Sequence, residues 1–215
     1  MPAGTVADLA VVSAATDAGP ALFAVELTAA GVTVHRQDTT TGQPEALIVF
    51  DQVAVPATAA LAGGADALTT LLEHAAAAWC VQTAGACQEA LRLTAAYTTE
   101  RRQFDKVIAT FQAVGQRAAD AYIDTEAVRL TAWQAAWRLG EGLPSAEAVA
   151  IAKFWADDGA QRVVHACQHL HGGVGVDREY PLHRYYLMVK QLSQTLGGGT
   201  TSLLRLGDLM AAGTA

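Results

Sequence analysis

The stretch ADALTTLLEHAAAAWCVQTAGACQEALRLTAAYTT, residues 65–99, decides how the rest of the sequence is interpreted. Its apolar residues recur at spacings of three and four, and no proline interrupts them. This periodicity predicts one helix of roughly 50 Å, at about 1.5 Å per residue. Alanine favours helix formation, and its small side chain lets a second helix approach closely. This part of the chain is therefore predicted to be helical and closely packed.

Four more helices are expected after the first, and together they predict a bundle of long antiparallel helices joined by short loops. The second helix covers residues 108–139 and ends at a Gly-Glu-Gly turn. The third begins with Ser145 as its N-cap and reaches about residue 169. Shorter helices over residues 181–194 and 200–210 complete the bundle.

The first part of the chain has a different pattern, with short apolar runs separated by turns rich in Gly and Thr. Four strands are expected, over residues 9–13, 22–27, 32–36 and 46–50. Four short strands make a small sheet with exposed edges, which is difficult to keep soluble alone. The sequence thus predicts a β region over residues 1–62, which needs a neighbour, and a helical region over residues 63–215.

Composition and charge exclude several classes of partner. With 14 Lys and Arg against 21 Asp and Glu, the net charge is −7, and the sequence pI is about 5.3. Such a chain lacks the long-range attraction that nucleic acid or an anionic membrane surface requires. Its longest apolar run is far shorter than the roughly 20 residues that span a bilayer. No secretory signal is recognisable at the start, so a cytoplasmic location is expected.

The positions of the cysteines and of two nearby histidines indicate packed or hydrogen-bonded side chains rather than a disulfide or a metal site. Cys80 and Cys87 lie seven residues apart on one predicted helix, roughly 10 Å, which is beyond disulfide reach. Both, and Cys167, are predicted to be small buried hydrophobic residues. His165 and His169 flank Cys167, but a metal site needs at least three converging ligands. Ordinary hydrogen-bonded histidines are expected, and no metal site is predicted.

Two short motifs have candidate binding chemistry. Arg101-Arg102-Gln103-Phe104 ends the first helix, where cations favour the helix dipole and where a guanidinium could also bind phosphate. Gly172-Gly173-Val174-Gly175 follows a helix, whereas the dinucleotide fingerprint follows a strand. The ordinary interpretation of this run is a helix C-terminus with left-handed glycines. Bare backbone also lets a flat or phosphorylated ligand approach closely, and the two interpretations are compatible.

These motifs belong to four blocks that resemble signatures of the acyl-CoA dehydrogenase family. The blocks are TTERRQF at 98–104, FQAV at 111–114, HLHGGVG at 169–175 and EYPLHRY at 179–185. Four linked blocks in the right order are far more specific than any one of them, and the resemblance runs from about residue 6 to residue 210. It implies a mainly α fold: an acyl-CoA dehydrogenase-type C-terminal four-helix bundle preceded by a partial antiparallel middle β-domain.

The resemblance implies a flavoprotein that oxidises a fatty or sterol acyl-CoA thioester. In the family, a carboxylate removes the α-proton while the β-hydrogen leaves as hydride to the flavin of FAD. The electrons then pass to an electron-transfer flavoprotein, and the subunits assemble as a dimer of dimers. This chain matches only the end of the β-domain and the bundle. It is therefore expected to hold FAD incompletely alone, and to form a homo- or hetero-oligomer with an acyl-CoA dehydrogenase paralogue.

The resemblance also assigns cofactor contacts. The matching positions are Arg101, Gln103, Phe104, Gln112, His169, Gly172 and Gly173. Arg101 stands where the family's arginine reaches the FAD pyrophosphate of a neighbouring subunit, and Gln112 stands near the adenosine half. His169 replaces the usual glutamine, which puts the adenine-side contact in doubt. Asp105 replaces a glycine, and its carboxylate near a pyrophosphate is unfavourable unless it is paired or points away.

The catalytic base is the main departure from the family pattern. The family's Glu precedes a Gly-Thr at the start of the last helix, whereas Gly198 occupies that position here. Glycine cannot take a proton. Some relatives place the base on the first long helix, where an ungapped alignment gives Ala75. Glu73 is the only nearby carboxylate, so it is the candidate base if the register shifts. The ordinary alternative is a solvated carboxylate near a helix start.

Three functions remain open. The first is a subunit that contributes flavin contacts and scaffold without a base. This resembles the base-lacking subunits of actinobacterial heteromeric sterol acyl-CoA dehydrogenases, to which the QTLGG ending at 194–198 is similar. The second is an active acyl-CoA dehydrogenase that uses Glu73. The third is a non-enzymatic helical assembly module.

Overall fold

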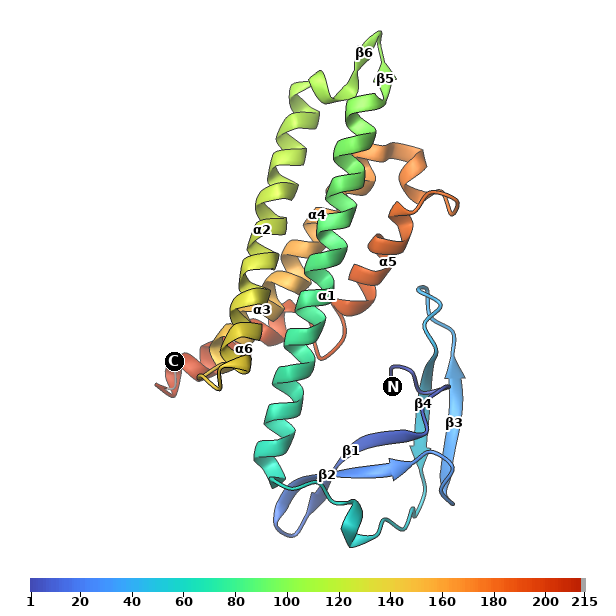
Figure 1. Ribbon diagram of the computed structural model, residues 1–215, viewed down its shortest axis with the longest axis vertical. Helices are drawn as coiled ribbons and strands as arrows, with labels where there is room; N and C mark the ends of the chain where they lie inside the picture. Colours follow the sequence, from blue (N-terminus) through green and yellow to red (C-terminus); the bar gives the residue numbers. More distant parts are fainter. Residues whose placement is uncertain (214–215) are drawn as a thin grey trace. The chain divides into compact units, whose positions relative to one another are not determined.

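The computed structural model describes residues 1–213, which fall into two compact units (Figure 1). The first unit, Met1–Leu72, contains the first four strands and the first turns of the longest helix. The second unit begins at Glu73 and contains the helical bundle. No helix within these residues is long and apolar enough to cross a membrane.

Two antiparallel hairpins make up the β unit. β1 (Leu9–Thr16) pairs with β2 (Gly19–Glu26), and β3 (Val32–Gln37) pairs with β4 (Glu45–Phe50). The prediction of one four-stranded sheet is wrong, because the strands form two separate ribbons. The segment after β4 occupies the outer edge of β2: Phe23 bridges Ala60, and the Leu61 N–H donates to the Leu22 carbonyl at 2.9 Å. That contact leaves β2 no free edge for β3.

The β unit has apolar side chains on surfaces that its own residues do not cover. Leu22 and Val25 of β2 are buried, as the alternation of a half-buried strand requires. Leu9 and Val11 of β1 are nevertheless exposed, as is Leu47 of β4. A two-stranded ribbon is marginally stable in water. These exposed apolar residues agree with the expectation that the β region needs a neighbour.

The long predicted helices are confirmed, with changed ends. They are α1 (Gly64–Glu100), α2 (Gln112–Gly140), α3 (Ala146–Phe154), α4 (Ala160–His171), α5 (Leu182–Leu192) and α6 (Gly199–Ala211). The second helix begins later than predicted, because the 3-10 turn η2 (Ile108–Thr110) precedes it. In Figure 1, α1 and α2 run along the bundle beside the shorter α4 and α5.

The third predicted helix is interrupted by a π-helical turn, η3 (Trp155–Gly159). A Cβ on Gly159 would lie 2.8 Å from the Trp155 ring, so this turn needs a glycine there. Ser145 is the N-cap residue of α3, as predicted, but its hydroxyl makes no cap hydrogen bond. Its Oγ donates instead to a carboxylate of α1. π-Turns such as η3 are frequent at functional sites.

Small side chains form the core of the bundle. On α2 the buried residues Ala121, Thr125, Val128, Ala132 and Ala135 recur at spacings of four and three. This is the spacing of a helix seam that packs closely against its neighbours. All three cysteines are free and buried, as predicted, and burial raises the pKa of the Cys80 thiol to about 12. The cysteines therefore pack as small hydrophobic residues.

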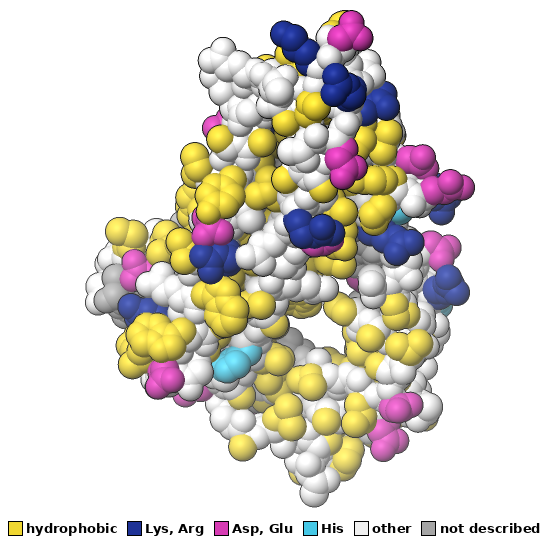
Figure 2. Space-filling model, turned by 45° about the horizontal axis from the view of Figure 1, so that its top comes forward, with side chains coloured by type: hydrophobic (Ala, Val, Ile, Leu, Met, Phe, Trp, Pro, Cys, Tyr) yellow, Lys and Arg dark blue, Asp and Glu magenta, His cyan; other side chains and the backbone are white. Residues whose placement is uncertain are grey.

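A second row of apolar side chains runs along the other face of α2. Ile123, Leu130, Trp133 and Trp137 are each more than half exposed, at spacings of seven, three and four. Hydrophobic side chains also occupy much of the surface in view in Figure 2. Exposed apolar surface of this kind marks interaction sites. The period is that of a helix-packing seam, so this face suits another helix.

Candidate functional site

One end of the bundle has a tight hairpin between α1 and α2, formed by β5 (Arg102–Gln103) and β6 (Lys106–Val107). Its two central residues, Phe104 and Asp105, have φ of 52° and 60°, as in a type I′ turn. A bulky residue rarely adopts this conformation. The Phe104 side chain is 86% exposed, and its ring meets only the edge of Phe111, at a centroid distance of 6.3 Å. The turn thus presents an aromatic ring to solvent.

Arg101 lies at the base of this hairpin with a fixed backbone. Its N–H donates to the Tyr97 carbonyl at 2.9 Å, and its own carbonyl accepts from the Ile108 N–H at 2.8 Å. Within residues 1–213 its exposed guanidinium has no hydrogen bond or ion pair. The amides of Gln103 and Gln112 are exposed in the same part of the chain. Arg101 is thus a positioned cation available to an anion.

The glycine run forms the end of α4, and its glycines have different roles. Gly172 has a φ of 61° and ends the helix, as predicted, before the 3-10 turn η4 (Gly172–Val176). A Cβ on Gly175 would lie 2.8 Å from the Gln168 carbonyl oxygen, so packing requires that glycine. A Cβ on Gly173 would meet nothing within 4 Å. Gly173 therefore offers bare backbone that a ligand can approach.

These groups fit the cofactor that the resemblance implies. A diphosphate needs a cation and close backbone, which Arg101 and Gly172–Gly173 supply. A flat ring system can lie against an exposed aromatic side chain such as Phe104. Asp105 lies in the turn, where its carbonyl accepts from Arg102 Nη2 at 2.9 Å. The residues present are thus compatible with FAD.

A cluster of three rings lies next to these segments. Tyr97 on α1 stacks on His171 at a centroid distance of 4.4 Å, and Tyr180 lies 5.2 Å from the same imidazole. His171 Nδ1 is 2.8 Å from the Cys167 carbonyl, and Nε2 is 3.1 Å from the Tyr180 hydroxyl. His171 is buried, and burial lowers its pKa. Although Tyr97, His171 and Tyr180 are near or within the quoted blocks, sequence reasoning did not identify them as a group.

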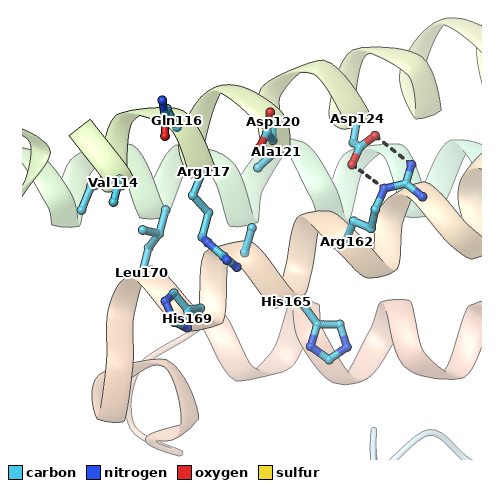
Figure 3. Close-up of a pocket in the computed structure, with 12 residues that line it drawn as sticks. Val114, Gln116, Arg117, Asp120, Ala121, Asp124, Arg162, His165, His169 and Leu170 are labelled. Carbon is cyan, nitrogen blue, oxygen red and sulfur yellow. Dashed lines mark hydrogen bonds and ion pairs between the residues drawn. The ribbon is translucent and has the colours of Figure 1, made fainter. Parts of the chain in front are cut away.

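A groove of about 630 Å³ lies between α2 and α4 (Figure 3). Arg117 of α2 and His165 and His169 of α4 line it, and an ion pair between Arg162 and Asp124 at 2.8 Å lies along its wall. The structure thus places His169 in a groove with Arg117, a residue that no sequence motif indicated. Its only sequence signal is a position three residues, or less than one helical turn, after the FQAV block.

The histidines of α4 do not converge. The His165 ring meets Tyr186 edge-on at 5.2 Å, whereas Cys167 is buried and points into the core. Within the described part of the chain, no three His, Cys, Asp or Glu side chains are placed to share a metal ion. These side chains instead contact protein groups or line the groove.

The other end of the bundle contains the glycine loop that precedes α6. Leu196 and Gly197 have φ of 61° and 89°. The buried Lys153 ammonium donates to Asp157 Oδ1 at 2.5 Å and to the Gly197 carbonyl at 3.0 Å. Burial raises the pKa of Asp157 to about 6, although Lys153 opposes the shift. The pair belongs to α3 and the π-turn, so this irregular part of the helix holds the glycine loop.

Glu73 is buried and bonded through both oxygens. Oε2 accepts from Ser145 Oγ at 2.9 Å, and Oε1 accepts from Arg205 Nη2 at 3.1 Å. Only 8% of the residue is exposed, so the alternative of a solvated carboxylate is wrong. The chain arrives at this geometry because Ser145 starts α3 and Arg205 lies on α6. Glu73 therefore joins three helices.

The helical region matches a known family. Residues 62–210 match the acyl-CoA dehydrogenase, C-terminal domain. Acyl-CoA dehydrogenase FadE27 of Mycobacterium tuberculosis is 42% identical, over 97% of this chain and 58% of that protein. FadE28 of the same organism is 37% identical, over 87% of this chain and 55% of that protein. The chain thus spans little more than half the length of these curated relatives.

Solved structures agree with the sequence matches. A variant of the Tcur3481-Tcur3483 steroid ACAD is 43% identical with a TM-score of 0.92, covering 99% of this chain and 58% of that one. The ChsE4-ChsE5 complex from Mycobacterium tuberculosis gives 41% identity and a TM-score of 0.94, covering 98% and 57%. Sequence blocks, family match and fold agree, and the chain belongs to the acyl-CoA dehydrogenase family.

Proposed function

We propose that this chain is a subunit of a heteromeric, FAD-dependent acyl-CoA dehydrogenase, to which it contributes cofactor contacts and scaffold but no catalytic base. The observation that carries the proposal is the contrast between Arg101 and Glu73. The guanidinium has no partner in the described residues, whereas both carboxylate oxygens are bonded. The chain can thus offer a cation to a cofactor but has no free carboxylate on α1 near the expected base position.

The hairpin end supports the cofactor part of the proposal. When bound, FAD accepts the hydride that leaves the substrate. Arg101 would neutralise the diphosphate, Gly172 and Gly173 would allow its close approach, and Phe104 would cover a flat part of the cofactor. Gln103, Gln112 and His169 are further candidate contacts. The partner chain would hold the remainder of FAD.

The glycine-loop end supports the absence of a base. A general base must come within hydrogen-bond reach of the proton that it takes. Gly198 has no side chain, and one oxygen of the neighbouring carboxylate, Asp157, accepts from the buried Lys153 ammonium. For Glu73 to act as the base, it would have to reach the substrate proton from the position that its bonds to Ser145 and Arg205 fix. Its geometry therefore favours an ion-pair role.

The partner and substrate are proposed from the relatives and from α2. Two similar solved structures are named as a steroid ACAD and as a complex of two components. We propose a steroid or fatty acyl-CoA substrate, an acyl-CoA dehydrogenase paralogue as partner and an electron-transfer flavoprotein as electron acceptor. The exposed seam of Ile123, Leu130, Trp133 and Trp137 would pack against the paralogue's helices.

Coexpression with the paralogue tests the proposal. The complex should copurify with FAD, seen by flavin absorbance, and should oxidise an acyl-CoA in the presence of an artificial electron acceptor. The chain alone should hold little FAD. Arg101→Ala should weaken FAD affinity of the complex about 10- to 150-fold, because a charged hydrogen bond is worth roughly 1.5–3 kcal/mol. Arg36→Ala, at an exposed arginine of β3, is the matched control.

Three results would contradict the proposal. If the chain alone bound FAD stoichiometrically and turned over substrate, it would be a self-sufficient enzyme rather than a base-lacking subunit. If every purified complex lacked FAD, the remaining function would be a helical assembly module. Loss of turnover with retained FAD in Glu73→Gln would instead assign the base to Glu73.

A further inference from the structure

We propose that Tyr97, His171 and Tyr180 form a positioning cluster that holds Arg101 and the Gly172–Gly173 backbone in the arrangement that a dinucleotide diphosphate requires. This inference rests on the proposed function, because it concerns the same cofactor end of the bundle. It assigns roles to three residues that are not themselves expected cofactor contacts. They would act through the segments that they fix.

The hydrogen bonds of His171 set its tautomer. A backbone carbonyl can only accept, so the Nδ1 that lies 2.8 Å from the Cys167 carbonyl carries the proton. In the neutral ring Nε2 is then an acceptor, and the Tyr180 hydroxyl donates to it at 3.1 Å. In an imidazolium the bond at Nε2 would reverse, with the tyrosine hydroxyl as acceptor, whereas in the neutral ring both nitrogens are satisfied as described. This bonding locks the ring plane against which Tyr97 stacks at 4.4 Å.

The cluster connects directly to both cofactor-facing segments. Tyr97 lies four residues before Arg101, and its carbonyl accepts the Arg101 N–H at 2.9 Å. His171 is the last residue of α4, so Gly172, with its φ of 61°, follows it immediately. Tyr180 comes from a third segment, the turn that leads into α5. A shift of any ring would therefore move the arginine and the glycine backbone relative to one another.

The charge around the cluster makes its integrity dependent on pH. Burial disfavours the imidazolium, and a protonated His171 would lose its acceptor for Tyr180. The other titratable groups here are Tyr97, Arg92 and Glu100 of α1, which influence Tyr180, Cys167 of α4, and His183 of α5, whose Nδ1 lies 2.7 Å from the Tyr180 carbonyl. Of these groups, only a histidine ordinarily changes charge between about pH 5 and 8. Acidification should therefore act through His171 and His183, and the part of the response that His171→Phe removes is the part that acts through His171.

The test uses the reconstituted complex and four variants. Tyr180→Phe removes one hydroxyl, His171→Phe keeps a ring but removes both nitrogens, and the double variant removes both partners. Tyr186→Phe is the matched control, because Tyr186 and His165 form a second Tyr–His contact between α5 and α4. FAD affinity is measured by fluorescence titration, and amide hydrogen exchange is followed over residues 98–103 and 170–176.

Tyr180→Phe and His171→Phe should each weaken FAD affinity about 3- to 10-fold, which corresponds to one buried hydrogen bond, whereas Tyr186→Phe should not. The double variant should lose less than the product of the two, because neither partner is then left unsatisfied. Exchange in the two segments should rise in Tyr180→Phe but not in Tyr186→Phe. The fall in FAD affinity on acidification should be reduced in both variants that lack His171.

The outcomes separate this inference from the proposed function. A wild-type complex that lacks FAD contradicts the proposed function, while the exchange measurement still decides whether the cluster positions the two segments. Unchanged exchange in Tyr180→Phe and His171→Phe overturns the positioning role whatever the flavin result. Equal losses in Tyr186→Phe would also overturn it, because the effect would not be specific to the cluster.

Discussion

The two ends of the helical bundle differ in the pairing of their charged side chains. At the hairpin end, around residues 101–112 and 169–180, a neutral ring cluster provides rigidity and the Arg101 guanidinium has no partner within residues 1–213. At the glycine-loop end, Lys153 is bonded to Asp157, and Glu73 to Arg205. A cation without a partner in the described residues can bind an external anion, whereas charges that are paired with each other join elements of the protein. These differences are the basis for proposing that the first end binds the cofactor and that the second is scaffold.

The most severe test of this comparison removes Lys153. The Lys153 and Asp157 side chains are only 6% and 4% exposed, so Lys153→Met would leave a buried, unpaired carboxylate. The loss of unfolding free energy should be about 3–5 kcal/mol in chemical denaturation. The double variant Lys153→Met with Asp157→Leu should recover most of that loss. A single-variant loss below about 1 kcal/mol would refute a scaffold role for the pair.

A glycine pair distinguishes packing from binding at the hairpin end. Gly175→Ala places a Cβ 2.8 Å from a backbone oxygen and should lower stability by about 1–3 kcal/mol. Gly173→Ala meets nothing within 4 Å and should change stability by less than about 0.5 kcal/mol. The second change should nevertheless reduce FAD affinity of the complex. Unaltered FAD affinity in Gly173→Ala would mean that the cofactor does not approach this backbone.

Glu73→Gln tests the glycine-loop end with a smaller expected loss of stability than Lys153→Met. The amide can still accept from Ser145, but it loses the charge that faces the half-exposed Arg205. The unfolding free energy should fall by about 1–2 kcal/mol, measured by denaturation. Turnover per FAD of the complex should persist. Loss of turnover without loss of FAD would reverse the assignment of Glu73 to scaffold.

The smallest expected effects are opposite pH dependences of stability. The pKa of Asp157 is raised from 3.8 to about 6, so the folded state binds the extra proton and loses stability as pH rises through that window. The pKa of His171 is lowered from 6.5, so stability is lost as pH falls below that value. The stability difference from wild type should therefore change with opposite slopes in Asp157→Asn and His171→Phe. Slopes of the same sign would contradict the comparison.

Much of the fold could be predicted because it follows from local periodicity. The spacing of apolar residues over 65–99 predicts α1 within one residue at each end. The single four-stranded sheet was mispredicted because strand pairing depends on which segment occupies each strand edge. Here residues 60 and 61 occupy the edge of β2. The π-turn was missed for a similar reason, since it depends on Trp155 packing over Gly159.

The candidate site, like the fold, could be predicted from the sequence only in part. The sequence by itself determined the family, the cofactor-contact candidates and the glycine at the expected base position, because these depend on residue identity and order. Only the tertiary structure decided that Glu73 is bonded to Ser145 and Arg205, and that Tyr97, His171 and Tyr180 meet. Those contacts join residues that are far apart in the chain. Chain order does not specify such distances, because they are set by how the helices pack.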